Sequence, residues 1–203
     1  MKTLFIPAKS KTQLNQKEFS KLKFPKNLAL FYSIQYETQA KEIKEILSKS
    51  YNVTTFSQVL GCSKPKIPKS TKAVLLIGNG KFHVISLAIE TNLPIYIYDL
   101  HKLNKISEKE IQKFQKKSKG AYLNYLKANK VGILISTKQG QQNFKRAIDF
   151  KKQLKNKSSY LFIENNLNPS EFENFPQIQS WVNTACPRLS FDNKGIINLG
   201  DIK

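Results

Sequence analysis

The sequence has 203 residues, of which 40% are hydrophobic and 11% aromatic. This composition is enough for one large or two small packed domains and excludes a disordered chain. No apolar run is long enough for a membrane span, and the apolar part of the N-terminal segment is too short for a secretory signal. We therefore expect a soluble, cytoplasmic protein with no membrane partner.

The net charge of +20 raises the question of nucleic acid, but only two of the 34 basic residues are arginine. Proteins that read bases and phosphates favour the forked guanidinium group, whereas the lysines here are spread over nearly every segment. The pattern indicates a solvated lysine surface rather than a specific nucleic-acid site. Such a field would still speed encounter with an acidic or RNA-bound partner.

Apolar runs alternate with amphipathic segments over the first half of the chain. The predicted elements are a strand at 28–34, a helix at 37–49, a strand at 51–56, a loop at 58–70, a strand at 73–77, a helix at 82–91 and a strand at 94–98. Continuous apolar strands of this kind are typical of a parallel sheet covered on both faces. Residues 1–27 do not fit this order: Met1–Pro7 is predicted as a strand that either extends the first sheet or remains from a missing domain.

The second half repeats the plan. The predicted elements are a long crossover helix at 107–129, strands at 131–135, 159–163, 179–183 and 196–199, a helix at 140–154 and a short helix after Asn168. We predict an α/β fold of two similar small domains, each a mostly parallel sheet flanked by helices. Residues 28–106 form the domain that carries Cys62, and residues 107–203 form the domain that carries Cys186.

The two cysteines are 124 positions apart and form no Cys-x-x-Cys pair, a spacing that by itself favours two inert thiols. Their neighbours point the other way. Gly61-Cys62-Ser63 and Ala185-Cys186-Pro187 place each sulfur among small residues or proline, in a turn that follows a predicted strand. Small neighbours leave room for a bulky metal cluster to approach the backbone.

Two strand–turn–helix segments contain glycines at the point where a ligand binds in open α/β sheets. Gly78-Asn79-Gly80-Lys81-Phe82-His83 and Ser136–Gln141, with Gly140, each place exposed amides at a helix start, which suits a carboxylate or phosphate. A plain tight turn explains either segment equally well, and His83 could be a structural cap. Arg188 is two residues from Cys186 and could clamp a carboxylate, or it could pair with Asp192. No serine–histidine–acid order, carboxylate pair or zinc spacing is present, so we predict no catalytic side chain.

Taken together, four stretches resemble the 2-(3-amino-3-carboxypropyl)histidine synthase family of diphthamide synthesis, both its archaeal members and the paired eukaryotic subunits. The order and the spacing of these stretches match the family across about residues 28–203. The stretches are Gln58–Cys62, Gly78–His83, Gly132–Gln141 and Val182–Arg188.

The resemblance implies three α/β domains that each give one cysteine to a 4Fe–4S cluster, whose open iron holds S-adenosylmethionine. It implies a non-canonical radical enzyme that transfers a 3-amino-3-carboxypropyl group to a histidine of translation elongation factor 2. Cys62 and Cys186 would be cluster ligands. The residues implied to hold S-adenosylmethionine are Gly78, Gly80, His83, Gly140, Gln141, Arg188 and Gln35.

The sequence also departs from the family pattern. The family's first domain, with the first cysteine, has no counterpart, and Met1–Ala8 resembles only its last strand. Asn79 and Lys81 replace an aspartate and an arginine of the family, and Gln142 replaces an arginine. Three hypotheses follow. A separate chain could supply the first domain and third thiolate, this chain could be an accessory subunit of a full-length family member, or it could be a basic binding module near elongation factor 2 or RNA.

Overall fold

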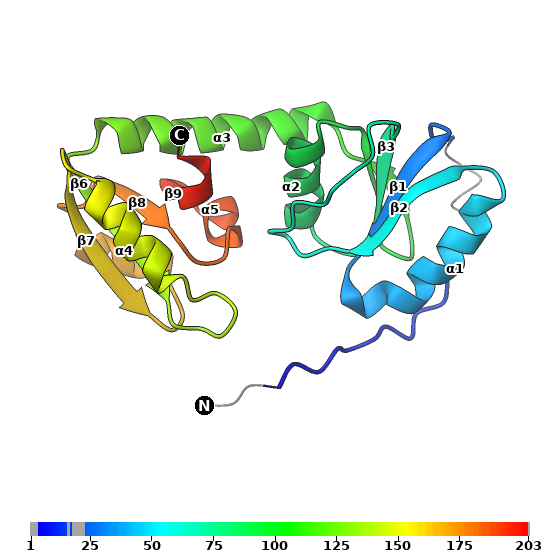
Figure 1. Cartoon of the computed structure of the whole chain (residues 1–203), viewed down its shortest axis with the longest axis horizontal. Helices are drawn as coiled ribbons and strands as arrows, with labels where there is room; N and C mark the ends of the chain where they lie inside the picture. Colours follow the sequence, from blue (N-terminus) through cyan, green and yellow to red (C-terminus); the bar gives the residue numbers. More distant parts are fainter. Residues whose placement is uncertain (1–3, 16, 18–22, 203) are drawn as a thin grey trace. The chain divides into compact units, whose positions relative to one another are not determined.

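A computed structural model of the chain describes residues 4–15, 17 and 23–202. The described chain divides into two compact units, residues 1–111 and 112–203, and the division falls within helix α3 (Glu108–Lys127). Each unit is an α/β structure built around one sheet (Figure 1), which confirms the predicted fold class. None of the helices in the described part is long and apolar enough to cross a membrane.

The sheet of the first unit has five strands. In spatial order they are β2 (Asn52–Gln58), β1 (Asn27–Tyr32), β3 (Ala73–Ile77), β4 (Ile95–Tyr98) and β5 (Leu103–Lys105). The first four are parallel, and β5 pairs with β4 in the antiparallel sense. The sequence did not predict β5, which lies at the edge of the sheet.

Alternate residues of the central strands feed two separate cores, because successive side chains of a strand point to opposite faces. Leu28 and Leu30 pack with α1 (Glu37–Ser48) on one face, whereas Ala29 and Phe31 pack with α2 (Lys81–Thr91) on the other. All five residues of β3 are completely buried, as expected of a central parallel strand. The two helices therefore cover opposite faces, and the loops at the carboxyl ends of the strands stay accessible.

The sheet of the second unit has four strands, all parallel. In spatial order they are β7 (Ser158–Glu164), β6 (Lys130–Ser136), β8 (Ser180–Asn183) and β9 (Ile196–Asn198). Helices α3 and α4 (Phe144–Gln153) cover one face, through residues such as Tyr125 and Phe150. The other face carries Trp181 and is covered by the 3₁₀ segment η3 (Pro169–Asn174) and by Leu189 of the short helix α5 (Arg188–Asp192).

The N-terminal segment differs from the prediction of a strand. Residues 4–7 belong to neither a strand nor a helix, and Leu4, Phe5 and Ile6 are 82%, 71% and 80% exposed. The prediction is wrong for these residues, and residues 1–3 lie outside the described part. The segment is anchored further along, because the Ser10 amide donates to the carbonyl of Gln35 at 2.7 Å.

Candidate functional site

Cys186 lies in a turn that follows the buried strand β8, and the side chain of Asn183 holds this turn. The Asn183 Nδ2 group donates to the Cys186 carbonyl at 2.8 Å and to Asn198 Oδ1 at 2.9 Å, while its Oδ1 accepts from the Ala185 amide at 3.0 Å. Asn183 is only 2% exposed, and its three bonds are partly buried. They hold the backbone around the half-buried Cys186 thiol.

Thr184 and Asn143 add a second set of bonds to the same turn. The Thr184 hydroxyl donates to the Leu134 carbonyl at 2.7 Å, and Asn143 Nδ2 donates to the Thr184 carbonyl at 2.8 Å. Leu134 belongs to the neighbouring strand β6, and Asn143 precedes α4. The turn is thus bound to two other elements of its unit.

A hollow of about 260 Å³ lies beside this turn at the carboxyl ends of the strands. It brings together Cys186, Arg188, Gln141 and Ser136, all four of which the sequence analysis had placed in motifs. Gly140, next to Gln141, has a φ of +78°, a conformation that favours glycine, and this lets the loop turn back after β6. The hollow is the place in the second unit where the motif residues converge.

Arg188 forms an ion pair with Asp192, its Nε lying 3.0 Å from Oδ2. The two side chains are 65% and 50% exposed, and they are one helical turn apart on α5. Of the two roles left open by the sequence, pairing with Asp192 is the one present in the structure. The pair uses the Nε–H donor, and the guanidinium has four other N–H donors.

Cys62 lies in an exposed turn of the first unit that follows β2. The Ser63 hydroxyl accepts from the Leu60 amide at 2.8 Å, and the Ser63 amide donates to the Leu60 carbonyl at 2.9 Å, which closes the turn around Gly61 and Cys62. A Cβ atom on Gly61 would lie 2.0 Å from the ring of Phe82. The turn that carries Cys62 is therefore packed directly against the first turn of α2.

The Gly78–His83 segment requires its glycines for packing and for backbone conformation. A Cβ atom on Gly78 would lie 2.7 Å from the Ser33 hydroxyl, and Gly80 has a φ of +103°. His83 is partly buried in the first turn of α2, and its ring contacts the ring of Phe82 edge-on. Two motifs, one with Cys62 and one with His83, thus meet at Phe82.

Asn79 and Lys81, the two residues that depart from the family pattern, each have a partner. Asn79 Nδ2 donates to the Tyr36 hydroxyl at 2.8 Å, and Lys81 Nζ lies 3.0 Å from Glu110 Oε1. The hydrogen bond from Lys81 holds the pKa of Glu110 below its ordinary value, although partial burial of the carboxyl opposes this shift. Gln35 is exposed beside Tyr36 and contributes its backbone carbonyl to the bond from Ser10.

Each unit contributes a single thiol. Within the described residues, no group of three or more His, Cys, Asp or Glu side chains is arranged to hold a metal ion. Sequence reasoning included Asn183 in the Val182–Arg188 stretch but gave it no role, although its side chain makes two hydrogen bonds within the cysteine turn. Its position directly after the apolar run of β8 was the available signal, since asparagine favours turns at strand ends.

The family model described as "Putative diphthamide synthesis protein" matches residues 1–196. The chain belongs to this family. It is 28% identical to the human 2-(3-amino-3-carboxypropyl)histidine synthase subunit 1, over 81% of its own length and 40% of that relative. It is 33% identical to the 2-(3-amino-3-carboxypropyl)histidine synthase of Methanocaldococcus jannaschii, over 95% of its own length and 57% of that relative.

Solved structures give the same result for the fold. The crystal structure of Dph2 from Pyrococcus horikoshii with a 4Fe-4S cluster superposes with a TM-score of 0.78 and 28% identity, covering 92% of this chain and 58% of that protein. The relatives are named as synthases, and one holds an iron–sulfur cluster. The chain spans only about two fifths to three fifths of the length of these proteins.

Proposed function

We propose that this chain is part of an iron–sulfur enzyme that transfers a 3-amino-3-carboxypropyl group from S-adenosylmethionine to a histidine of translation elongation factor 2. This reaction is the first step of diphthamide synthesis. The observation that carries the proposal is the turn of Cys186, which is held by the buried Asn183 at the edge of a hollow lined by Gln141 and Arg188. Family membership and the cluster in the Pyrococcus relative support the same assignment.

The residues of this chain fit two of the ligands of a 4Fe–4S cluster. Thiolates are the usual ligands of such clusters, and Cys62 and Cys186 are both accessible and placed on closed turns. The 203 residues contain two cysteines, which account for two of the ligands. We propose that a partner supplies a third thiolate, either a separate chain with a further α/β domain or a full-length family member.

The chain's other residues would bind and orient the substrate. Arg188 has N–H donors beyond the one that Asp192 occupies, and these would bind the carboxylate of S-adenosylmethionine. Gln141 and the Gly140 turn would contact the same part of the molecule. In the first unit, Gly78, Gly80, His83 and Gln35 would line the approach to Cys62. A cluster held by these thiolates would supply the electron for cleavage of the S-adenosylmethionine C–S bond.

Anaerobic reconstitution tests the cluster ligands. The chain is loaded with iron and sulfide, alone and with a single-domain protein that carries the candidate third cysteine, and bound iron and the visible absorbance are measured. We expect Cys62→Ser and Cys186→Ser each to lower bound iron several-fold, whereas Thr38→Ala, an exposed change on α1, leaves it unchanged. If both cysteine variants retain the iron of the parent chain in both settings, the ligand assignment is wrong.

A separate measurement distinguishes an active part from an accessory subunit. With the partner present and the iron content matched, Arg188→Lys should weaken S-adenosylmethionine binding about tenfold, because lysine cannot make a forked contact with a carboxylate. Asp192→Asn should weaken it less than twofold. An accessory subunit would show no change in S-adenosylmethionine binding for either variant while still contributing iron ligands.

A further inference from the structure

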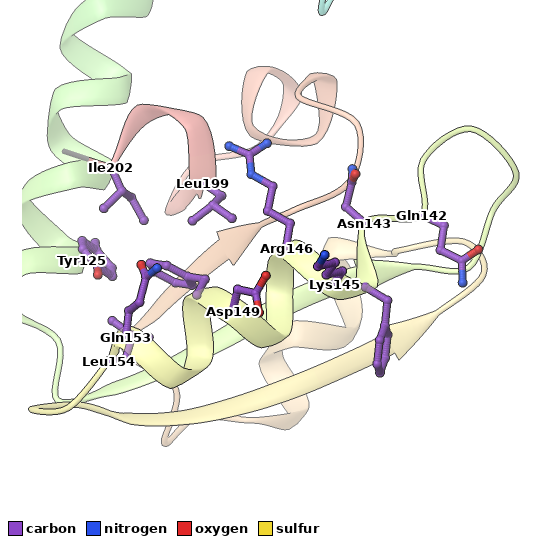
Figure 2. Close-up of a pocket in the computed structure, with 12 residues that line it drawn as sticks. Tyr125, Gln142, Asn143, Lys145, Arg146, Asp149, Gln153, Leu154, Leu199 and Ile202 are labelled. Carbon is purple, nitrogen blue, oxygen red and sulfur yellow. The ribbon is translucent and has the colours of Figure 1, made fainter.

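The second unit has a larger hollow of about 760 Å³ on the α4 side, apart from Cys186 and Arg188. It lies between α4, the C-terminal half of α3 and the 3₁₀ turn η4 (Leu199–Asp201), and Figure 2 shows Arg146, Asp149 and Gln153 on the side of α4 toward Leu199 and Ile202. Its volume falls within the range of small-molecule sites, about 300–1,000 Å³. None of the residues that we assign to the cluster or to S-adenosylmethionine lines this hollow.

Arg146 has no hydrogen bond or ion pair with any part of the chain that the structure describes, although Asp149 lies one helical turn away. It is one of only two arginines among 34 basic residues, and the other, Arg188, is paired. Arg146 is exposed at the edge of the hollow, so its guanidinium can be reached from solution. A forked cation that lines a hollow and has no partner is suited to a carboxylate or phosphate.

The rest of the lining divides into polar and apolar parts. Leu199, Ile202 and Leu154 supply aliphatic surface, and Tyr125 adds an aromatic ring that is itself packed against Phe150. Lys145 adds a second positive charge and Asp149 a negative one, so the lining has a net charge of +1. This balance favours a single anionic group with an apolar body over a polyanion.

Gly200 lies next to the Arg146 guanidinium, in the turn that follows Leu199. A Cβ atom on Gly200 would be 3.8 Å from Arg146 Nη2, which is ordinary contact, and the backbone of Gly200 is not in the left-handed region. Alanine is therefore tolerated at this position, whereas a longer side chain would occupy the volume beside the guanidinium. Substitutions of increasing size at Gly200 therefore place increasing bulk beside the Arg146 guanidinium.

We propose that this hollow, defined by Arg146, Tyr125 and the Leu199–Ile202 turn, binds a small amphipathic monoanion, a carboxylate or phosphate attached to an apolar or aromatic group. The site is independent of the cluster and of the proposed transfer reaction. Asn143, which lines the hollow, also donates to the Thr184 carbonyl in the Cys186 segment, so the rim of this site and the cysteine turn share one side chain.

The test is a titration of the isotope-labelled whole chain, followed through the amide resonances of α4. The probes are 3-phenylpropanoate, phenyl phosphate, the neutral 3-phenylpropanamide and inorganic phosphate. We expect the two organic anions to bind at least about tenfold more tightly than the amide, because the charged contact to Arg146 is lost, and more tightly than inorganic phosphate, because the apolar wall is unused. No binding of either organic anion, or equal binding of the amide, overturns the proposal.

Variants locate the binding to this hollow. Arg146→Gln should weaken 3-phenylpropanoate at least about tenfold, and Lys152→Gln, the same change of charge on α4 outside the lining, less than twofold. Gly200→Ala should bind as the parent chain does and Gly200→Leu at least tenfold more weakly, with Trp181 fluorescence unchanged in both as a check of folding. Equal losses in Arg146→Gln and Lys152→Gln would mean that the probe senses only the overall charge, which refutes the site.

Discussion

Replacing Asn183 with alanine tests whether the cysteine turn is held as the structure indicates. The change removes three side-chain hydrogen bonds, two from Nδ2 and one to Oδ1, at a residue that is 2% exposed. Each bond contributes about 0.5–1.5 kcal/mol net, and the Ala185 amide loses its acceptor. We therefore expect the second unit to lose about 2–4 kcal/mol of unfolding free energy.

The chain provides its own probe for this measurement. Its single tryptophan, Trp181, lies on β8 two residues before Asn183, so urea unfolding followed by tryptophan fluorescence reports on the second unit. Asn124→Ala is the matched control, because Asn124 is exposed on α3 and its side chain makes no hydrogen bond with the described residues. A loss below about 1 kcal/mol for Asn183→Ala, or one equal to the control, would refute the account of the turn.

The remaining predictions concern the first unit. Gly61→Ala should destabilise it by about 1–3 kcal/mol, because the new methyl group overlaps the Phe82 ring. The control is Gly120→Ala on the exposed face of α3 in the second unit, which should be neutral or stabilising. Urea unfolding followed by far-ultraviolet circular dichroism compares the two variants. The pKa of Glu110 is lowered in the folded chain by its hydrogen bond with Lys81, so the pair stabilises the fold above the unfolded pKa of the carboxyl. This stability is lost as the pH falls through the lowered value, and Glu110→Gln should flatten the acid limb of the stability profile; an unchanged limb contradicts the pairing.

Periodicity predicted the central elements well, because a buried strand or an amphipathic helix needs apolar residues at regular positions along its whole length. All the described strands except β5 were anticipated to within a few residues. β5 was missed because Leu103–Lys105 is three residues long, and only Leu103 is buried. Helix α4 was placed four residues too early, since Gly140 at a φ of +78° and Asn143 form a turn first.

The sequence predicted the parts of the candidate site that depend on a distinctive residue type, namely cysteine or glycine. Cys62, Cys186 and the glycines are conspicuous in the sequence, and the structure shows what several of the glycines do: Gly61 and Gly78 admit neighbouring side chains and Gly80 and Gly140 adopt positive φ. Asn183 was assigned no role, because its bonds to Cys186 and Asn198 depend on how β8 and β9 pair. The Arg146 hollow was invisible for the same reason, since its walls come from three separate elements.

The two units position their thiols by partly different physical means. In the first unit, the Ser63–Leu60 hydrogen bonds and the packing of Gly61 on Phe82 hold the turn, whereas in the second a buried amide side chain does so through hydrogen bonds. In both units, the chain's own bonds and contacts hold the turn that carries the thiol. We expect that adding the proposed partner, with its third thiolate, raises bound iron without changing the stability of the second unit measured by Trp181 before loading.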